Sequence, residues 1–388
     1  HSNNCYFGLI RHNVRQLYMQ ILLAAGAFFP DIGGPAIHVR KIAERLKKEG
    51  FRPVVVAYGD DPSNTDLGFK IIRISRKFPK ILQWFFYFLI IFIYAPFSKL
   101  VYAFDPTSAG LPACLIAKIF RKPFIIRIGG DPIWEREVEK GRRLMPIKKY
   151  YELGLHKKDK SLLFKTIKFV VRKANAIIVS NNFFGAFYKN YYGVEKNKIE
   201  FINNPLFKRE DSSFVLPNEP VILFGGRFVS YKNLPLVIEA FKEVGIGKLS
   251  LIGSGPDKNK LIELVNSMDL KEKVLFFDPM TQENLFQYIK ESSICIGPAL
   301  SEFSPNFILE ALSFGKPVLL SKGHGLSLNL PEEFLFDPEN KEELKQKLVY
   351  LFNEKNYEKA VSDVRDLPMD NSWEKVTGDN IMVIKKFI

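Results

Sequence analysis

The sequence predicts an α/β protein of two domains, each built on a parallel, doubly wound sheet. With 388 residues, the chain is long enough for about two domains. Short apolar runs alternate with helical segments along most of the chain, which is the pattern of parallel strands joined by crossover helices. The pattern stops at 203–220 and then starts again. We therefore expect a linker there, a first domain at 1–205 and a second domain at 206–371.

The first half shows a strand, a glycine loop and a helix directly after residues 1–18, which carry little pattern. The strand is expected at 20–28, the loop at 30–35 and the amphipathic helix at about 37–49. Further strands of this half are expected at 54–57, 71–74, 100–103, 124–128, 176–180 and 199–202, and further helices at 109–120 and 181–192.

The second half repeats this alternation. The expected strands are 221–224, 249–252, 274–277, 294–296 and 318–321, and the expected helices are 236–244, 259–268, 282–290, 307–314, 342–353 and 373–387. Ser304 is a good N-cap for the helix at 307–314, and Pro305 suits its first position.

The segment 81–97 is almost wholly apolar and is preceded by basic residues. Its length is near the lower limit for a membrane span, roughly 17–25 residues. A span would place two parts of one sheet on opposite sides of a bilayer. We therefore expect a helix that packs on the sheet and presents an apolar outer face to a membrane surface, with ordinary core packing as the alternative.

The charge of the chain is strongly uneven. The formal net charge is +14, but residues 1–205 hold 34 Lys and Arg against 15 Asp and Glu, whereas residues 206–388 hold 22 against 27. A basic first half favours an anionic partner. No zinc-type Cys/His spacing or nucleic-acid motif is present, so a membrane surface or lipid phosphate is favoured over nucleic acid. The three widely spaced cysteines favour a reducing compartment.

The stretch from Pro298 to Glu310 is predicted to follow a buried strand and to open a helix. Glu302 falls in the loop, and Asn306 and Glu310 are one helical turn apart on one face. The start of a helix carries free N–H groups and a positive dipole end, where a phosphate can bind. Two carboxylates beside a phosphate site suit a sugar nucleotide. The alternative is an ordinary strand-to-helix turn with solvated glutamates.

Three glycine-containing loops follow predicted strands, where ligands bind in open parallel sheets. One contains Gly226, Arg227 and Lys232, whose cations can flank a diphosphate. The others contain Gly33 with Gly34, and Gly253. Each signal alone is also compatible with a plain turn or with surface cations. No Gly-x-Gly-x-x-Gly follows the first strand, which disfavours a dinucleotide-dependent dehydrogenase.

Taken together, the order and spacing of these motifs resemble the retaining glycosyltransferases of the GT-B fold, in particular glycosyltransferase family four. The resemblance covers nearly the whole chain from Met19 and is strongest at about 221–320. It implies two Rossmann-like domains that face a central cleft, with a C-terminal helix, 372–388, that returns to the first domain. The matching motifs are Gly33-Gly34, Gly226-Arg227 with Lys232, Leu251 to Pro256, Pro298 through Glu302 to Glu310, and Gly315 to Val318.

The resemblance also implies residue roles. Arg227 and Lys232 would neutralise the leaving diphosphate, Glu310 would bind the ribose hydroxyls, and Glu302 would contact the donor sugar near the reacting centre. Such enzymes usually need no metal, and the sequence has no Asp-x-Asp motif, so we expect no metal or other cofactor. The donor-binding residues so implied are Gly33, Gly34, Gly226, Gly253, Ser304, Asn306, Phe307 and Glu310.

The chain departs from this family at one position. Many members carry His after the strand that matches 124–128, whereas this sequence reads Gly129-Gly130-Asp131. We expect Asp131 to face the acceptor hydroxyl as an acid/base or hydrogen-bonding group. The alternative is a turn cap before Pro132.

We therefore expect a cytoplasmic enzyme, or one peripheral at the inner face of the cell membrane. It would transfer a sugar from a UDP-, GDP- or other nucleotide-diphosphate sugar to a lipid-linked or cell-envelope glycan acceptor. The alternatives are a sugar-nucleotide epimerase of the same fold and a nucleotide-sugar-binding protein without catalysis.

Overall fold

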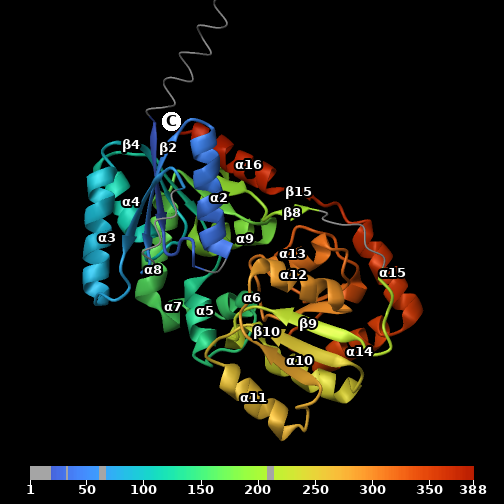
Figure 1. The fold of residues 1–388 in the computed structure, drawn as a ribbon. Helices are drawn as coiled ribbons and strands as arrows, with labels where there is room; N and C mark the ends of the chain where they lie inside the picture. The colour runs from blue at the N-terminus through green and yellow to red at the C-terminus, as the bar shows by residue number, and fades with distance from the viewer. Residues whose placement is uncertain (1–18, 32–33, 61–66, 208–213) are drawn as a thin grey trace, which may run out of the picture. The chain divides into compact units, whose positions relative to one another are not determined.

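The structure is a computed structural model that describes residues 19–31, 34–60, 67–207 and 214–388. It divides into two compact units, each with its own parallel sheet, and this confirms the predicted fold class (Figure 1). The first unit comprises the described residues up to Gly129, Ser161–Asn203 and Trp373–Ile388. The second comprises Gly130–Lys160 and the described part of Asn204–Ser372.

The first unit is organised around a seven-stranded parallel sheet with the order β3-β2-β1-β4-β5-β6-β7. The direction of winding reverses between β1 and β4, so the sheet is doubly wound, as the alternation of apolar runs predicts. The inner strands β1, β5 and β6 are buried from end to end and β4 is buried except at Lys99, which is typical of a sheet covered on both faces. The strands are β1 (Gln20–Ala25), β2 (Arg52–Tyr58), β3 (Lys70–Ile74), β4 (Ser98–Ala103), β5 (Phe124–Arg127), β6 (Ala176–Val179) and β7 (Ile199–Phe201).

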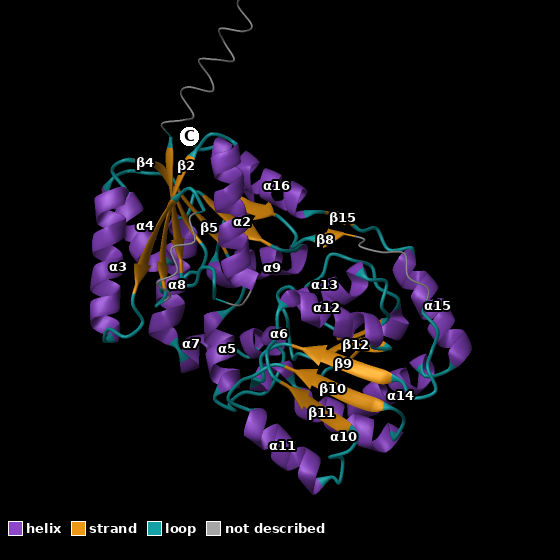
Figure 2. Ribbon diagram, viewed as in Figure 1, coloured by secondary structure: helices purple, strands orange, loops and turns teal. Residues whose placement is uncertain are grey.

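Helices cover this sheet in two groups (Figure 2). The helices α2 and α16 pack against each other, while α4 packs against both α3 and α8. The hydroxyl of buried Tyr102 on β4 donates to Asn380 Oδ1 at 2.6 Å, which fixes the C-terminal helix to the first sheet. The helices of this unit are α2 (Gly34–Lys48), α3 (Lys80–Tyr94), α4 (Gly110–Ile119), α8 (Ser161–Lys173), α9 (Asn182–Phe187), the π-turn Tyr188–Tyr192, the 3₁₀ turn Lys196–Lys198 and α16 (Trp373–Lys385).

The apolar segment predicted at 81–97 forms α3, whose inner side packs on the sheet through Tyr87 and Ile91. The Tyr87 hydroxyl lies 3.1 Å from the carbonyl oxygens of both Ala25 and Val56. The outer side is apolar and open to solvent, with Ile81 83% and Phe85 58% exposed. Among the described residues, no helix combines the length and apolar character that crossing a membrane requires.

The second unit contains a six-stranded sheet with the order β11-β10-β9-β12-β13-β14. Its strands are β9 (Val221–Gly225), β10 (Lys248–Ile252), β11 (Val274–Phe277), β12 (Ile294–Gly297), β13 (Val318–Ser321) and β14 (Leu335–Phe336), and a separate antiparallel pair joins β8 (Leu206–Phe207) to β15 (Asp370–Asn371). Its helices are α5 (Pro132–Glu139), α6 (Ile147–Glu152), α7 (Leu155–Asp159), the 3₁₀ turn η3 (Ser230–Lys232), α10 (Leu234–Val244), α11 (Lys258–Ser267), α12 (Gln282–Glu291), α13 (Asn306–Ser313), the 3₁₀ turn η4 (Glu332–Phe334), α14 (Lys341–Leu351) and α15 (Glu354–Arg365).

Two of the differences from the predicted organisation concern the segment Gly130–Lys160 and the helix α15. The segment Gly130–Lys160 groups with the second unit, although it lies inside the predicted first domain. The rings of Trp134 and Tyr231 lie 5.7 Å apart, and Ile147 N–H donates to Ser301 Oγ at 3.0 Å, so tertiary contacts determine the grouping. The helix α15 was not predicted, although its buried face recurs at helical spacing.

Candidate functional site

The predicted donor-site loops of the second unit lie side by side because the strands that precede them pair directly. β9 and β12 are parallel neighbours, and the chain reverses its direction of winding between them. In an open α/β sheet such a switch point, beyond the carboxyl ends of the strands, is where ligands bind. The two loops are also joined by a backbone hydrogen bond of 2.8 Å from Leu300 N to Tyr231 O.

Gly226 and Gly253 stand where the loop after β9 meets the loop after β10. Gly226 N donates to Ile252 O at 2.9 Å, and Phe228 N donates to Ser254 O at 2.8 Å. Gly253 has φ +148°, and a Cβ there would overlap the carbonyl oxygen of Gly226. The two glycines therefore allow a close approach of two backbones.

The predicted cations Arg227 and Lys232 both point at carboxylates of the same unit. Lys232 Nζ pairs with Glu302 Oε2, and both side chains are largely buried. Arg227 Nη2 lies 3.4 Å from Glu139 Oε1 at the end of α5, with the guanidinium side chain 65% exposed. The structure thus brings Arg227, Lys232 and Glu302 to one place, with the Tyr231 ring 5.3 Å from Lys232 Nζ.

The helix α13 begins at Asn306, one residue after Pro305, which was predicted as its first position. Ser304 was expected as its N-cap, but Pro305 occupies that position with ψ 89°, and no side chain caps the helix. The Ser304 prediction was wrong because this ψ is not helical, so the first helical residue is Asn306. The uncapped end leaves first-turn N–H groups without the side-chain oxygen that an N-cap supplies, and an anion is a suitable partner for them.

The remaining predicted residues of α13 occupy its first turns. Asn306 Oδ1 accepts from Asn204 Nδ2 at 2.8 Å, and Glu310 Oε1 accepts from Gln282 Nε2 at 2.6 Å. Phe307 is half-buried, with its ring centroid 6.2 Å from that of Phe224. Asn306 and Glu310 therefore lie on the accessible side of the helix, whereas Phe307 packs against the core.

Asp131 is fully buried at the N-terminus of α5. Its Oδ1 accepts from Ile133 N at 3.1 Å and Trp134 N at 2.8 Å, and its Oδ2 accepts from Tyr151 Oη at 2.7 Å. The alternative interpretation, a cap before Pro132, accounts for these contacts. The acid/base role stays a prediction that this geometry does not support.

Glu135, one turn after Asp131, is a carboxyl group of the site that the sequence analysis missed. Burial, reinforced by the negative charges of Asp131 and Glu302, raises the pKa of Glu135 to about 8. Burial likewise raises the pKa of Tyr231, again with Glu302 and Glu135 contributing. The available signal was the spacing of Glu135 and Glu139, one turn apart on a short helix, but nothing local indicated which loop they face.

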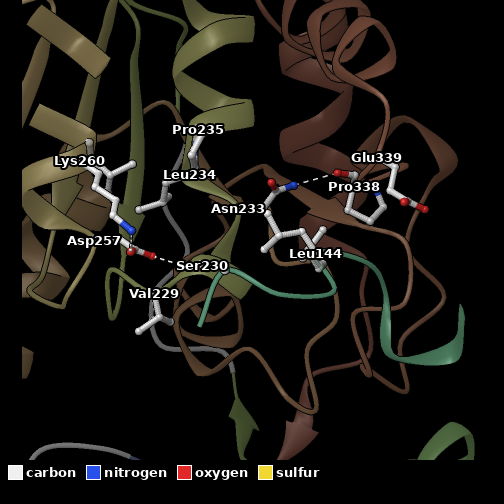
Figure 3. Close-up of a pocket in the computed structure, with 13 residues that line it drawn as sticks. Leu144, Val229, Ser230, Asn233, Leu234, Pro235, Asp257, Lys260, Pro338 and Glu339 are labelled. Carbon is white, nitrogen blue, oxygen red and sulfur yellow. Dashed lines mark hydrogen bonds and ion pairs between the residues drawn. The ribbon is translucent and has the colours of Figure 1, made fainter. Parts of the chain in front are cut away.

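A cavity of about 410 Å³ lies beside η3 and the start of α10 (Figure 3). Its walls include Leu144, Val229 and Leu234, and its polar groups are already engaged. Ser230 Oγ donates to Asp257 Oδ2, and Asn233 Nδ2 donates to the Pro338 carbonyl, both at 2.8 Å. None of the predicted site residues lines this cavity. We therefore place the candidate site at the Lys232–Glu302 pair and the start of α13, and not at this cavity.

Of the predicted glycines Gly33 and Gly34 of the first unit, only Gly34 is among the described residues. Gly34 is the first residue of α2, after β1, whereas Gly33 lies outside the described residues.

Over 19–31, 34–60, 67–207 and 214–388, no three His, Cys, Asp or Glu side chains are grouped so that they could hold a metal ion.

Two family models together match most of the chain. The model described as Glycosyltransferase Family 4 matches residues 32–206, and the model described as Glycosyl transferases group 1 matches residues 208–364.

Several of the relatives that match are named as glycosyltransferases. An uncharacterized glycosyltransferase of Methanocaldococcus jannaschii is 26% identical over 71% of this chain and 65% of its own length, which is just under two thirds. An alpha-monoglucosyldiacylglycerol synthase of Streptococcus pneumoniae is 24% identical over 82% of this chain and 74% of its own length. Among solved structures, Anabaena HepE in complex with UDP and glucose has a TM-score of 0.73 at 15% identity, over 95% of this chain and 100% of that chain, and this likeness supports the fold.

The cap interpretation of Asp131 makes a stability prediction. Asp131→Ala should lower the free energy of unfolding by about 2–3 kcal/mol, because it removes the N-cap and leaves the buried Tyr151 hydroxyl without its acceptor. Asp131→Asn keeps a capping oxygen and should cost less than about 1 kcal/mol. Urea unfolding of both variants measures this. An Asp131→Ala protein as stable as wild type would contradict the cap.

Proposed function

Because the chain belongs to the GT-B glycosyltransferases of family 4 type, we propose that it is a retaining, metal-independent enzyme that transfers a sugar from a nucleotide-diphosphate sugar to an acceptor hydroxyl. One observation supports this proposal most strongly. Two cations, Arg227 and Lys232, lie with the Glu302 carboxylate and the uncapped start of α13 at the β9–β12 switch point.

The diphosphate is the part of the donor that this arrangement suits best. Arg227 and Lys232 supply two positive charges, and the first turn of α13 supplies N–H groups and a positive dipole end. Charge develops on the diphosphate when the sugar–phosphate bond breaks. Fixed cations and amides stabilise that charge without the reorganisation that water would need. In this way the protein itself supplies the positive charge, which is the basis for proposing metal independence.

The two glutamates are assigned different parts of the donor. Glu310 lies one turn into α13, on the same face as Asn306, where a carboxylate can accept hydrogen bonds from the ribose hydroxyls. Glu302 lies in the loop before the helix and is paired with Lys232, and we assign it to the sugar side of the diphosphate. Glu302 holds the Lys232 ammonium in position, and the diphosphate would share that ammonium.

The acceptor proposed is a lipid-linked or other cell-envelope glycan precursor. The outer side of α3 carries exposed Phe85, Phe88 and Phe92, and neither α3 nor α4 contains an acidic residue. Exposed Lys80 and Lys118 accompany this apolar face. Apolar side chains together with lysines suit a surface of anionic lipid. The name of the Streptococcus pneumoniae relative, alpha-monoglucosyldiacylglycerol synthase, is that of a glycolipid, which supports an acceptor that carries a lipid.

The glutamate assignment predicts two different kinetic defects. Glu310→Ala should weaken binding of the preferred nucleoside diphosphate by about tenfold or more, because hydrogen bonds to a charged group are lost. Glu302→Ala should instead lower kcat by roughly 10²–10³-fold with a smaller change in nucleotide affinity. A screen of UDP- and GDP-sugars first identifies the donor. Calorimetry then measures nucleotide affinity, and product analysis in the presence of EDTA measures kcat.

The exposed Glu272→Ala variant of the same unit serves as the control and should match wild type. Unchanged nucleotide affinity in Glu310→Ala would contradict the ribose assignment. An epimerised donor, with no transfer to any acceptor, would contradict a transferase.

The α3 surface predicts membrane binding. Replacing Phe85, Phe88 and Phe92 together by Ser should weaken binding to vesicles that contain phosphatidylglycerol by at least about tenfold, because each buried large apolar side chain is worth about 1.5–3 kcal/mol. Tyr87 and Ile91 keep the inner contacts of the helix, so folding should be preserved.

The matched control replaces Leu162 and Phe183, which are 78% and 39% exposed elsewhere on the same unit, by Ser. Vesicle co-sedimentation and circular dichroism compare the three proteins. Equal partitioning of wild type and the α3 variant would rule out this surface as the membrane contact.

A further inference from the structure

The helix α5 is held firmly against the loops that carry the proposed diphosphate site. The Trp134 ring lies 5.7 Å from that of Tyr231, and Trp134 Nε1 donates to the Met145 carbonyl at 2.8 Å. Farther along the same segment, Ile147 N–H donates to Ser301 Oγ. The side chains on this face of α5 are therefore fixed relative to η3 and to the loop of Glu302.

Two carboxyl groups of α5, Glu135 and Glu139, face this place. Glu139 Oε1 lies 3.4 Å from Arg227 Nη2. Glu135, one turn earlier and half-buried, interacts electrostatically with Glu302 in the neighbouring loop and with Tyr231 in η3. Glu139 thus adjoins Arg227, and Glu135 lies near Glu302, the carboxylate paired with Lys232, although both glutamates come from a helix that the donor motifs do not include.

The position of the Glu135 carboxyl group is set by the backbone before α5. Its Oε1 accepts from Asp131 N at 3.1 Å, which leaves Oε2 for another partner. Gly130 provides the room, because a Cβ at that position would collide with Glu135 Oε1. The collision involves only the end of a flexible side chain, so Gly130→Ala should displace this carboxyl group while the fold is kept.

The charges around Glu135 favour its neutral form. Asp131 caps the helix that carries Glu135, Glu139 lies at the end of that helix, and Glu302 lies in the loop after β12. The nearby cations are already paired, Lys232 with Glu302 and Arg227 with Glu139. Consistently, the pKa of Glu135 is raised to about 8 by burial and by these neighbouring carboxylates. At pH 7 the group therefore carries a proton and can donate a hydrogen bond.

We propose that Glu135 is a substrate-contacting residue of this site, a neutral carboxyl group that donates a hydrogen bond to an anionic oxygen of the donor diphosphate. This inference rests on the proposed transferase function. An ionised glutamate beside Glu302 and Glu139 would repel a diphosphate, whereas a protonated one adds a donor to those of Arg227, Lys232 and α13. The proton stays on Glu135, so no chemical step is added to the reaction.

The proposal couples nucleotide binding to pH. If only the protein with protonated Glu135 binds well, the apparent dissociation constant rises as the protonated fraction falls. For a pKa of about 8, affinity should drop about tenfold between pH 7 and pH 9. The terminal phosphate of the nucleotide loses its last proton near pH 6, so it does not titrate in this window.

The test is calorimetric titration of the whole protein with UDP and with GDP from pH 7 to pH 9.5. Wild type should lose affinity through pH 8. Glu135→Gln, whose amide is always a neutral donor and whose oxygen can still accept from Asp131 N, should bind within about twofold of wild type at pH 7 and show no loss by pH 9. Glu152→Gln, an exposed carboxylate in α6, is the matched control and should follow the wild-type curve.

A second variant separates contact from structural support. Gly130→Ala keeps Glu135 but displaces its carboxyl group, so nucleotide affinity at pH 7 should fall about fivefold or more while the melting temperature changes little. If Glu135 only supported the backbone at Asp131, Gly130→Ala would lower the melting temperature and leave nucleotide affinity at pH 7 unchanged.

The outcomes distinguish this inference from the proposed function. Parallel pH curves for wild type and Glu135→Gln, or unchanged affinity in Gly130→Ala, would overturn the role of Glu135 and leave the transferase site standing. Failure of the wild-type protein to bind UDP, GDP or any other nucleoside diphosphate would overturn both.

Discussion

The parallel pairing of β9 with β12 is the constraint on which the candidate site depends. These strands are distant in sequence. From the boundary between them, successive strands are added toward both edges of the sheet, β10 and β11 on one side and β13 and β14 on the other. Their pairing brings the loop of Arg227 and Lys232 beside the loop of Glu302 and the start of α13. The backbone bond from Leu300 to Tyr231 then holds the two loops together. Cations and a helix dipole can act on one diphosphate only because the topology places them at one sheet edge.

Charge balance is the second organising feature. Lys232 is paired with Glu302, and Arg227 with Glu139, so each proposed diphosphate ligand has a carboxylate beside it. Pairing keeps the largely buried Lys232 ammonium from being an isolated charge, which would be costly. It also means that a diphosphate must share these cations with carboxylates. A carboxyl group that stays neutral at pH 7, the role proposed for Glu135, would give the site a donor without adding to the repulsion.

The sequence was sufficient for features that depend on local patterns. The alternation of strands and helices, the glycine at the Gly253 turn and the spacing of Asn306 and Glu310 all follow from short-range rules, and the structure contains each of them. The segment 130–160 could not be placed in this way, because its grouping with the second unit depends on contacts such as Trp134 with Tyr231, about 100 residues apart. For the same reason Asp131 was selected and Glu135 was missed. A buried cap and a carboxyl group facing a site look alike until Tyr151, Glu302 and Tyr231 are in place.

The central claim is that a nucleoside diphosphate binds where Lys232, Arg227 and the start of α13 meet. A crystal structure of the protein with UDP or GDP, whichever binds more tightly, tests this most directly. The account predicts phosphate oxygens within hydrogen-bonding distance of Lys232 Nζ and of a backbone N–H in the first turn of α13. A nucleotide bound instead in the cavity beside Leu144 and Val229, with the Lys232–Glu302 pair untouched, would contradict it.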